Sequence, residues 1–115
     1  AESVRALVNA QRTAGIGVDR VAVHFHDSDG QGLSNTLTAI EAGVRVVDAS
    51  VGGIGGSPFA KHATGNLATE ELVSALDSMG IATGVDVEKI VATAKWLGQQ
   101  LGRELPGRAA RAPFG

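Results

Sequence analysis

The sequence predicts an α/β fold, in the form of a segment of a larger β/α barrel. Two β-branched runs, residues 20–26 and 44–50, each precede a helix-like stretch. Strands that alternate with helices form parallel units, because a parallel return requires a crossover connection. A parallel sheet must be covered on both faces, and a chain with two or three strands cannot close a sheet by itself. Part of a larger barrel satisfies both requirements.

The N-terminal half is expected to contain a helix and then one strand–helix unit. Residues 2–14 show helical periodicity, and Gly15 follows where a left-handed C-cap residue would end the helix. Residues 20–26 alternate as a strand does, and residues 31–42 form the next helix before Gly43. The apolar side chains predicted to face inward from these two helices are Val4, Leu7, Val8, Leu33, Leu37 and Ile40.

The C-terminal half repeats this order with a longer connection. Residues 44–50 are the second strand, and residues 50–66 form a glycine-rich segment, here called the glycine loop. Thr69 is the predicted N-cap of the following helix, which ends at a glycine, and Asp86 is the predicted N-cap of the last one. The tail, residues 103–115, is punctuated by Pro and Gly and is expected to be flexible. Core positions predicted in these helices are Leu72, Val73, Leu76, Met79, Ile90, Ala94, Trp96, Leu97 and Leu101.

Composition restricts the classes of function. With 115 residues, 43% of them hydrophobic and 19% charged, the chain suits one folded domain. A net charge of −2 gives no electrostatic reason to expect nucleic acid or an anionic membrane as partner, and the lack of cysteine excludes disulfides and thiolate metal sites. The N-terminus lacks the plan of a signal peptide, so a cytosolic protein is expected. Because the sequence starts without Met and inside a helical pattern, we expect it to be a piece of a longer chain.

Two histidines stand one residue apart at the end of the first strand. Residues i and i+2 of a strand project from the same face, so His24 and His26 should point together while Phe25 points away. Barrel enzymes keep their active sites at the carboxyl ends of the strands, and Asp27 and Asp29 follow in the next loop, where they could orient the imidazoles. The pair suits a shared metal ion, although two histidines that only satisfy hydrogen bonds at a strand end would look the same.

The glycine loop follows the second strand and should therefore lie at the same end of the barrel. Its glycines allow close backbone approach and movement, as an active-site loop requires, but an ordinary flexible connection remains an alternative. Two known motifs fail here, because the GxGxxG that starts at Gly53 ends in Pro58 and the nucleophile elbow has Phe59 in place of glycine. Ser57 is a loop hydroxyl unless a base lies beside it. Asn66 is either a cap or turn residue or a carbonyl-oxygen ligand of a hard cation.

These residues together resemble the hydroxymethylglutaryl-CoA lyase family. The stretches HFHDSDGQGLSN, GIGGSPFA and GNLATEEL occur in the order and approximate spacing of that family, and the likeness runs from about Val21 to Leu101. The resemblance implies that residues 1–115 are the C-terminal segment, about the last three β/α units, of a (β/α)8 TIM barrel. Isopropylmalate and homocitrate synthases share the His pair and the GN element but not the GGxPFA loop.

The family implies a site and a reaction. His24, His26 and Asn66 match ligands of Mg²⁺ or Mn²⁺, and Gly55, Gly56 and Asn66 match positions that bind substrate. The reaction is the retro-Claisen cleavage of 3-hydroxy-3-methylglutaryl-CoA, or a related acyl-CoA, to acetyl-CoA and acetoacetate, with His24 as the base. The resemblance also implies a homodimer, located in the bacterial cytoplasm or in the mitochondrial matrix.

The sequence departs from the family in two respects. Ser57 stands where the lyases have a catalytic cysteine, and a hydroxyl is a weaker acid than a thiol, so protonation of the enolate should suffer. Nothing in the chain matches the metal-binding aspartate of the first barrel strand, so residues 1–115 alone are expected to be inactive. Two alternatives stay open: a Claisen-condensing synthase or aldolase of the same superfamily, and a non-catalytic metal-binding or interaction fragment.

Overall fold

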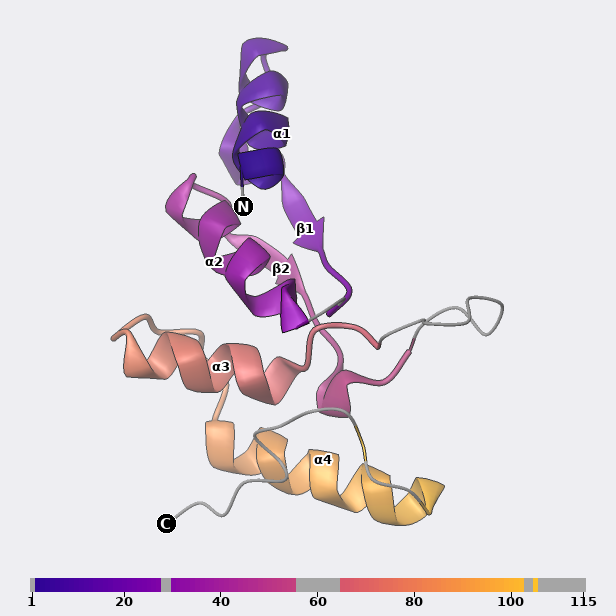
Figure 1. The fold of residues 1–115 in the computed structure, drawn as a ribbon. Coiled ribbons are helices and arrows are strands. Elements are labelled where there is room, and N and C mark those ends of the chain that lie inside the picture. The colour runs from indigo at the N-terminus through magenta and orange to yellow at the C-terminus, as the bar shows by residue number, and fades with distance from the viewer. Residues whose placement is uncertain (1, 28–29, 56–64, 103–104, 106–115) are drawn as a thin grey trace.

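The computed structural model describes residues 2–27, 30–55, 65–102 and 105. Helices and strands alternate along the chain, and the elements follow one another from one end of an elongated molecule to the other (Figure 1). In chain order they are α1 (Glu2–Thr13), the 3-10 turn η1 (Val18–Arg20), β1 (Ala22–His24), α2 (Gly32–Glu41), β2 (Val46–Asp48), the 3-10 turn η3 (Val51–Gly53), α3 (Thr69–Ser78) and α4 (Val87–Leu101).

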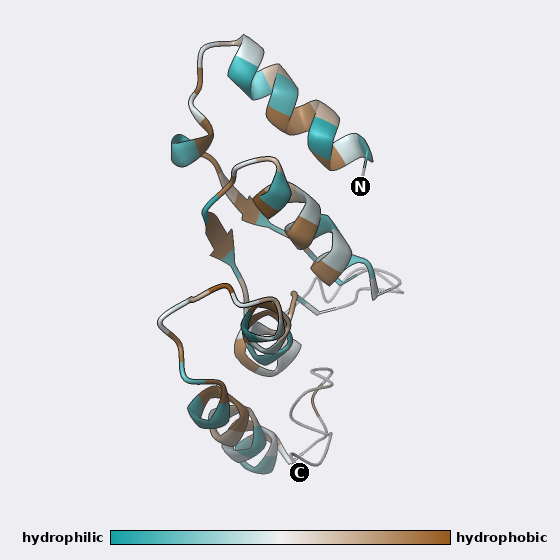
Figure 2. Ribbon diagram, turned by 90° about the vertical axis from the view of Figure 1, so that its left-hand side faces the viewer, coloured by the Kyte–Doolittle hydropathy of each residue, from teal (hydrophilic) through white to brown (hydrophobic). Residues whose placement is uncertain are grey.

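The sheet is parallel, as the alternation of strands and helices predicts. β1 pairs with β2 in the register Ala22↔Val46, Val23↔Val47 and His24↔Asp48. In both strands only the central residue is partly buried, and the residues on either side of it are exposed. Helix α2 packs along the pair (Figures 1 and 2) and so covers one face of the sheet. His24 and Asp48 are exposed residues of their strands, and among the described residues the face to which they belong is not covered by a helix of its own. An open inner face is what a piece of a barrel would present.

The strands are shorter than predicted, and their carboxyl ends are joined by a later segment. Residues 65–69 run between these ends and exchange backbone hydrogen bonds with both: Leu67 N donates to Phe25 O at 3.1 Å, and Ser50 N donates to Leu67 O at 2.9 Å. His26 and Ser50 therefore form isolated bridges, with Asn66 and Ala68 respectively. Residues far apart in the sequence meet at this end of the sheet.

Two apolar clusters lie on either side of α2. The first joins α1 to β1 and α2, and the second joins α2 to the first turns of α3. Leu7, predicted to face inward, is 62% exposed and is not part of the first cluster. The buried members of the two clusters are Val4, Val8, Val21, Ala39 and Val44 in the first, and Leu67, Leu72 and Leu76, against which Leu33, Leu37 and Ile40 pack, in the second.

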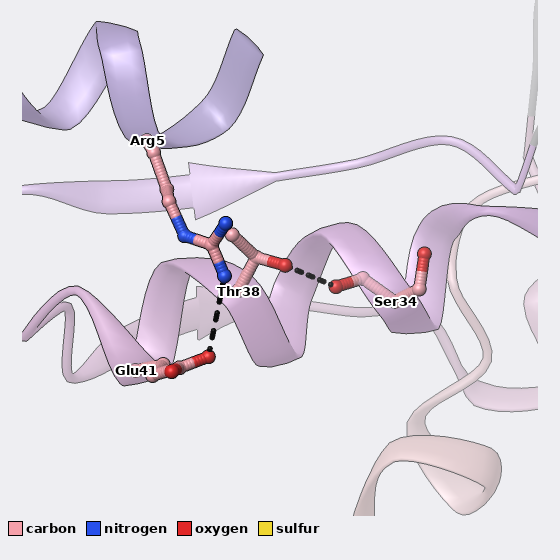
Figure 3. A network of polar contacts seen from close by, with 4 residues as sticks. All are labelled: Arg5, Ser34, Thr38 and Glu41. Carbon is pink, nitrogen blue, oxygen red and sulfur yellow. Dashed lines mark hydrogen bonds and ion pairs between the residues drawn. The ribbon is translucent and has the colours of Figure 1, made fainter. Parts of the chain in front are cut away.

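Polar contacts hold α1 against α2 at the surface (Figure 3). Arg5 forms an ion pair with Glu41 at 3.6 Å. Within α2, Thr38 Oγ1 donates to Ser34 O at 3.0 Å. An exposed ion pair contributes at most about 1 kcal/mol, so the apolar cluster beneath it accounts for most of the docking of α1.

The helix ends are mostly those predicted. Gly15, Gly43 and Gly80 have φ of 88°, 110° and 74° and stop their helices. The Asp86 side chain accepts hydrogen bonds from two backbone N–H groups in the first turn of α4, which confirms it as an N-cap. The prediction for Thr69 is wrong: it is the first residue of α3, and Ala68 is the N-cap without a side-chain bond. The bridge between Ser50 and Ala68 fixes where the extended segment ends and the helix begins.

Three predicted core residues are also wrong: Met79 and Trp96 are each 57% exposed, and Leu101, at the end of α4, is 48% exposed. Met79 follows the last turn of α3, beyond the buried Leu76, and Trp96 lies on the side of α4 opposite Val91 and Ala94. Of the predicted flexible tail, only Leu105 is among the described residues. Among all the residues that the structure describes, no helix is long and apolar enough to cross a membrane.

Candidate metal and substrate site

The histidine pair has the geometry that strand alternation predicts. His24 ends β1, and the ring centroids of His24 and His26 lie 5.5 Å apart with planes at 75°. Phe25 between them turns to the other side and packs against the first apolar cluster. Burial of Phe25 thus fixes the direction in which both imidazoles point, toward the open face at the carboxyl end of the strand.

Asp48, rather than a residue of the following loop, is the carboxylate beside His24. The parallel register places Asp48 directly across from His24, and its Oδ2 lies 3.9 Å from His24 Nδ1. Asp27, predicted as an orienting group, instead accepts a hydrogen bond from Gly32 N at 3.0 Å and so caps the start of α2. Asp29 lies outside the described residues. The strand pairing, which the sequence did not specify, would have identified Asp48.

Asn66 is brought to the histidines by the bridging segment. It pairs with His26 in a backbone bridge, and Asp27 N donates to Gly65 O at 3.0 Å next to it. Its side-chain Nδ2 donates to Ile54 O at 3.1 Å. Its Oδ1 is buried and accepts no hydrogen bond among the described residues. The amide oxygen is therefore an acceptor held in place with its lone pairs unused.

His24, Asp48 and Asn66 line one cavity of about 780 Å³ beside β2, whereas His26 is not among the residues that line it. Its walls are both polar and apolar, and the apolar part comes from α2, from α3 and from the segment after α3, with Ile40, Leu72 and Ile81 as examples. An apolar cavity with a few convergent polar groups is the usual form of a small-molecule site.

The donor set fits a divalent cation. Imidazole nitrogens and amide oxygens both bind divalent cations, and a buried acceptor without a donor costs about 1–3 kcal/mol unless something satisfies it. Across residues 2–27, 30–55, 65–102 and 105, no three His, Asp or Glu side chains lie close enough to hold an ion. Asn66 is therefore needed to make a third ligand, and further ligands would have to come from elsewhere.

The start of the glycine loop lies against Asn66. Gly55 has φ of 110°, and an ideal Cβ on it would lie 2.5 Å from Asn66 Nδ2, so only glycine fits here. A Cβ on Gly65 would likewise overlap Gly53 O. The predicted close approach of the loop backbone is thus to Asn66. Gly56 and Ser57 lie outside the described residues.

Glu70 is buried although the sequence gives little reason to expect a buried charge at its position. As an acidic residue in the first turn of α3 it suits the helix dipole, but it is fully buried, and its Oε1 accepts a hydrogen bond from Gly52 N at 2.9 Å. Its Oε2 is buried without a partner among the described residues. The one available signal was its helical phase, three residues before the buried Val73.

Comparison with known proteins identifies a family and several similar proteins. Residues 2–97 match the HMGL-like family. A mitochondrial hydroxymethylglutaryl-CoA lyase of Mus musculus is 48% identical over 97 residues, which cover 84% of this chain and 30% of that protein. A Bacillus subtilis hydroxymethylglutaryl-CoA lyase is 44% identical over 90 residues, 78% of this chain and 30% of that one.

Solved structures give the same result. A Bacillus subtilis HMG-CoA lyase superposes with a TM-score of 0.87 at 40% identity, over 94% of this chain and 36% of that one. An Acinetobacter baumannii HMG-CoA lyase in complex with coenzyme A and 3-methylmalate superposes with a TM-score of 0.88 at 37% identity, over 97% of this chain and 36% of that one. The chain thus spans about 30% of the length of the curated relatives it matches.

Proposed function

Because the chain belongs to the HMGL-like family, we propose that it forms part of a divalent-metal-dependent lyase that cleaves 3-hydroxy-3-methylglutaryl-CoA to acetyl-CoA and acetoacetate. The observation that carries the proposal is the junction of His24, His26 and the unpaired Asn66 Oδ1 at the carboxyl end of the parallel strands. The relatives named above are lyases of this kind, which favours the acyl-CoA substrate over other hydroxy acids.

His24, His26 and Asn66 are the residues that would hold Mg²⁺ or Mn²⁺. When bound, the ion would act as a Lewis acid that lowers the free energy of developing negative charge on the substrate oxygens. The apolar cavity wall, to which Ile40 and Leu72 contribute, would exclude water and strengthen electrostatic interactions at this place.

His24 is proposed both as a ligand and as the base that removes the hydroxyl proton. A neutral imidazole has one nitrogen lone pair, so the same ring cannot hold an ion and accept a proton at once. The Mn²⁺ affinity of His24→Ala separates the roles. Loss of affinity marks His24 as a ligand, whereas retained affinity with lost turnover marks it as the base, with Asp48 beside Nδ1 to stabilise the imidazolium.

Ser57 is proposed to take the place of the acid that protonates the acetyl-CoA enolate. A hydroxyl delivers a proton less readily than a thiol, so the protein should be slow or should use another acid. The decisive comparison is acetyl-CoA release from 3-hydroxy-3-methylglutaryl-CoA by Ser57 and Ser57→Cys forms of the longest natural chain that contains residues 1–115, called the full-length protein below.

We expect metal-dependent release by the serine form and faster release by Ser57→Cys. If only the cysteine form releases acetyl-CoA, the proposed metal site would still be supported, but the natural substrate would be a different molecule. No release by either form, with metal bound, would refute the lyase proposal.

The remaining features of the proposal concern the whole protein. Residues 1–115 would be the C-terminal segment of the barrel, inactive alone because the remaining metal ligands lie elsewhere. The full-length protein would be a homodimer that binds an acyl-CoA. Mitochondrial and bacterial lyases are both among the relatives, so the mitochondrial matrix and the bacterial cytoplasm are both consistent with them.

A further inference from the structure

A buried carboxylate from α3 holds the turn that begins the glycine loop. Glu70 is 0% exposed, and its Oε1 accepts a 2.9 Å hydrogen bond from Gly52 N. A charged group is costly to bury unless hydrogen bonds or a partner compensate for it, and here a single bond to the backbone is the compensation among the described residues. This bond joins residues 18 positions apart, so it connects two elements of the fold.

A second side chain holds the same turn from another direction. Leu105 follows α4 and is 5% exposed. Gly52 has φ of 72°, and a Cβ built on it would overlap Leu105 Cδ1. The turn η3 thus packs between α3 and α4 (Figure 1), with Leu105 against Gly52. Gly52 is held by a hydrogen bond from its amide and by a close apolar contact.

The turn leads directly to the partner of Asn66. Ile54 lies two residues after Gly52, and its carbonyl oxygen accepts the hydrogen bond from Asn66 Nδ2 at 3.1 Å. Since an amide has its oxygen and nitrogen on opposite sides, this bond determines where Asn66 Oδ1 points. A displacement of the turn would move Ile54 O and rotate the amide.

We propose that Glu70 and Leu105 are positioning residues that act through the Val51–Gly53 turn and Ile54 to aim Asn66 Oδ1 at the metal. The inference rests on the proposed function, because it assumes the metal site of His24, His26 and Asn66. It connects the chain after α4, far from the histidines in sequence, to the geometry of a single ligand.

The test is the affinity of the full-length protein for Mn²⁺, measured from the electron paramagnetic resonance signal of free Mn²⁺. Loss of an outer group that orients a ligand typically weakens metal binding by about 10- to 100-fold, and we expect Glu70→Ala and Leu105→Ala to fall in or near this range. Glu70→Gln keeps an oxygen acceptor for Gly52 N and should stay within about threefold of the unchanged protein. Asp77→Ala, an exposed acid of the same helix, and Leu101→Ala, 48% exposed at the end of α4, are the matched controls and should leave the affinity unchanged.

A double-mutant cycle separates positioning from general damage. In an Asn66→Ala background the ligand is gone, so Glu70→Ala should change the Mn²⁺ affinity by less than about twofold. If Glu70→Ala does not fold, Leu105→Ala carries the same cycle with the carboxylate intact.

The inference would be overturned if Glu70→Ala weakened Mn²⁺ binding equally with and without Asn66→Ala, or if neither Glu70→Ala nor Leu105→Ala weakened it. In both cases a loss of Mn²⁺ affinity in Asn66→Ala alone would still support the metal site. If Asn66→Ala leaves the affinity unchanged, or the unchanged protein binds no Mn²⁺, the proposed metal site fails, and the inference fails with it.

Discussion

Gly52 provides a quantitative test of how tightly the turn is held. Gly52 and Gly80 have nearly the same φ, 72° and 74°, but a Cβ on Gly52 would overlap Leu105 while a Cβ on Gly80 would meet nothing within 4 Å. In both, alanine carries a backbone strain of about 1–2 kcal/mol, offset by about 0.4–1 kcal/mol of reduced unfolded-state entropy. Only Gly52→Ala adds the cost of overpacking, about 1–3 kcal/mol.

The free energy of unfolding of the full-length protein, from the midpoint of urea denaturation, should therefore fall by about 0–1.6 kcal/mol for Gly80→Ala and by about 1–4.6 kcal/mol for Gly52→Ala. Adding Leu105→Ala to Gly52→Ala removes the overlap, so the two changes together should cost less than their sum by at least about 0.5 kcal/mol. The packing of Leu105 on the turn would be refuted if Gly52→Ala and Gly80→Ala lowered the free energy of unfolding equally and the effects of Gly52→Ala and Leu105→Ala were additive.

Other substitutions test separate parts of the fold and site. Asp86→Ala removes the N-cap of α4 and should cost about 1 kcal/mol in urea denaturation, whereas an effect below 0.2 kcal/mol would contradict the cap. Leu67→Ala should cost about 2–5 kcal/mol because the side chain is fully buried, while Met79→Ala, at 57% exposure, should stay within about 0.5 kcal/mol; a reversed order would contradict the second cluster. Ser57→Cys should raise kcat for acetyl-CoA release, and an unchanged kcat would show that another group supplies the proton.

Local patterns in the sequence were sufficient for the elements and for the histidine pair. Glycines with positive φ end the helices where they were predicted, and Asp86 caps α4 through hydrogen bonds within three residues. The alternation of residues 20–26 placed both imidazoles on one face because the pattern depends only on the local backbone. The α/β class and the parallel pairing followed from the order of the elements.

Features that depend on distant contacts could not be predicted in this way. The bridge from Ser50 moved the N-cap of α3 from Thr69 to Ala68, and the pairing of β1 with β2 brought Asp48 to His24. The burial of Glu70 has no local signal beyond its helical phase, because its partner Gly52 lies in another element. In these three cases a tertiary contact overrode a local preference or determined a position that no local pattern could give.

Metal dependence of turnover tests the central claim most directly. The full-length protein is stripped of metal with a chelator, and acetyl-CoA release from 3-hydroxy-3-methylglutaryl-CoA is followed as Mn²⁺ or Mg²⁺ is restored. We predict no release before metal is added, recovery afterwards, and no recovery in His26→Ala. Equal release with and without metal, or full recovery in His26→Ala, would contradict the account.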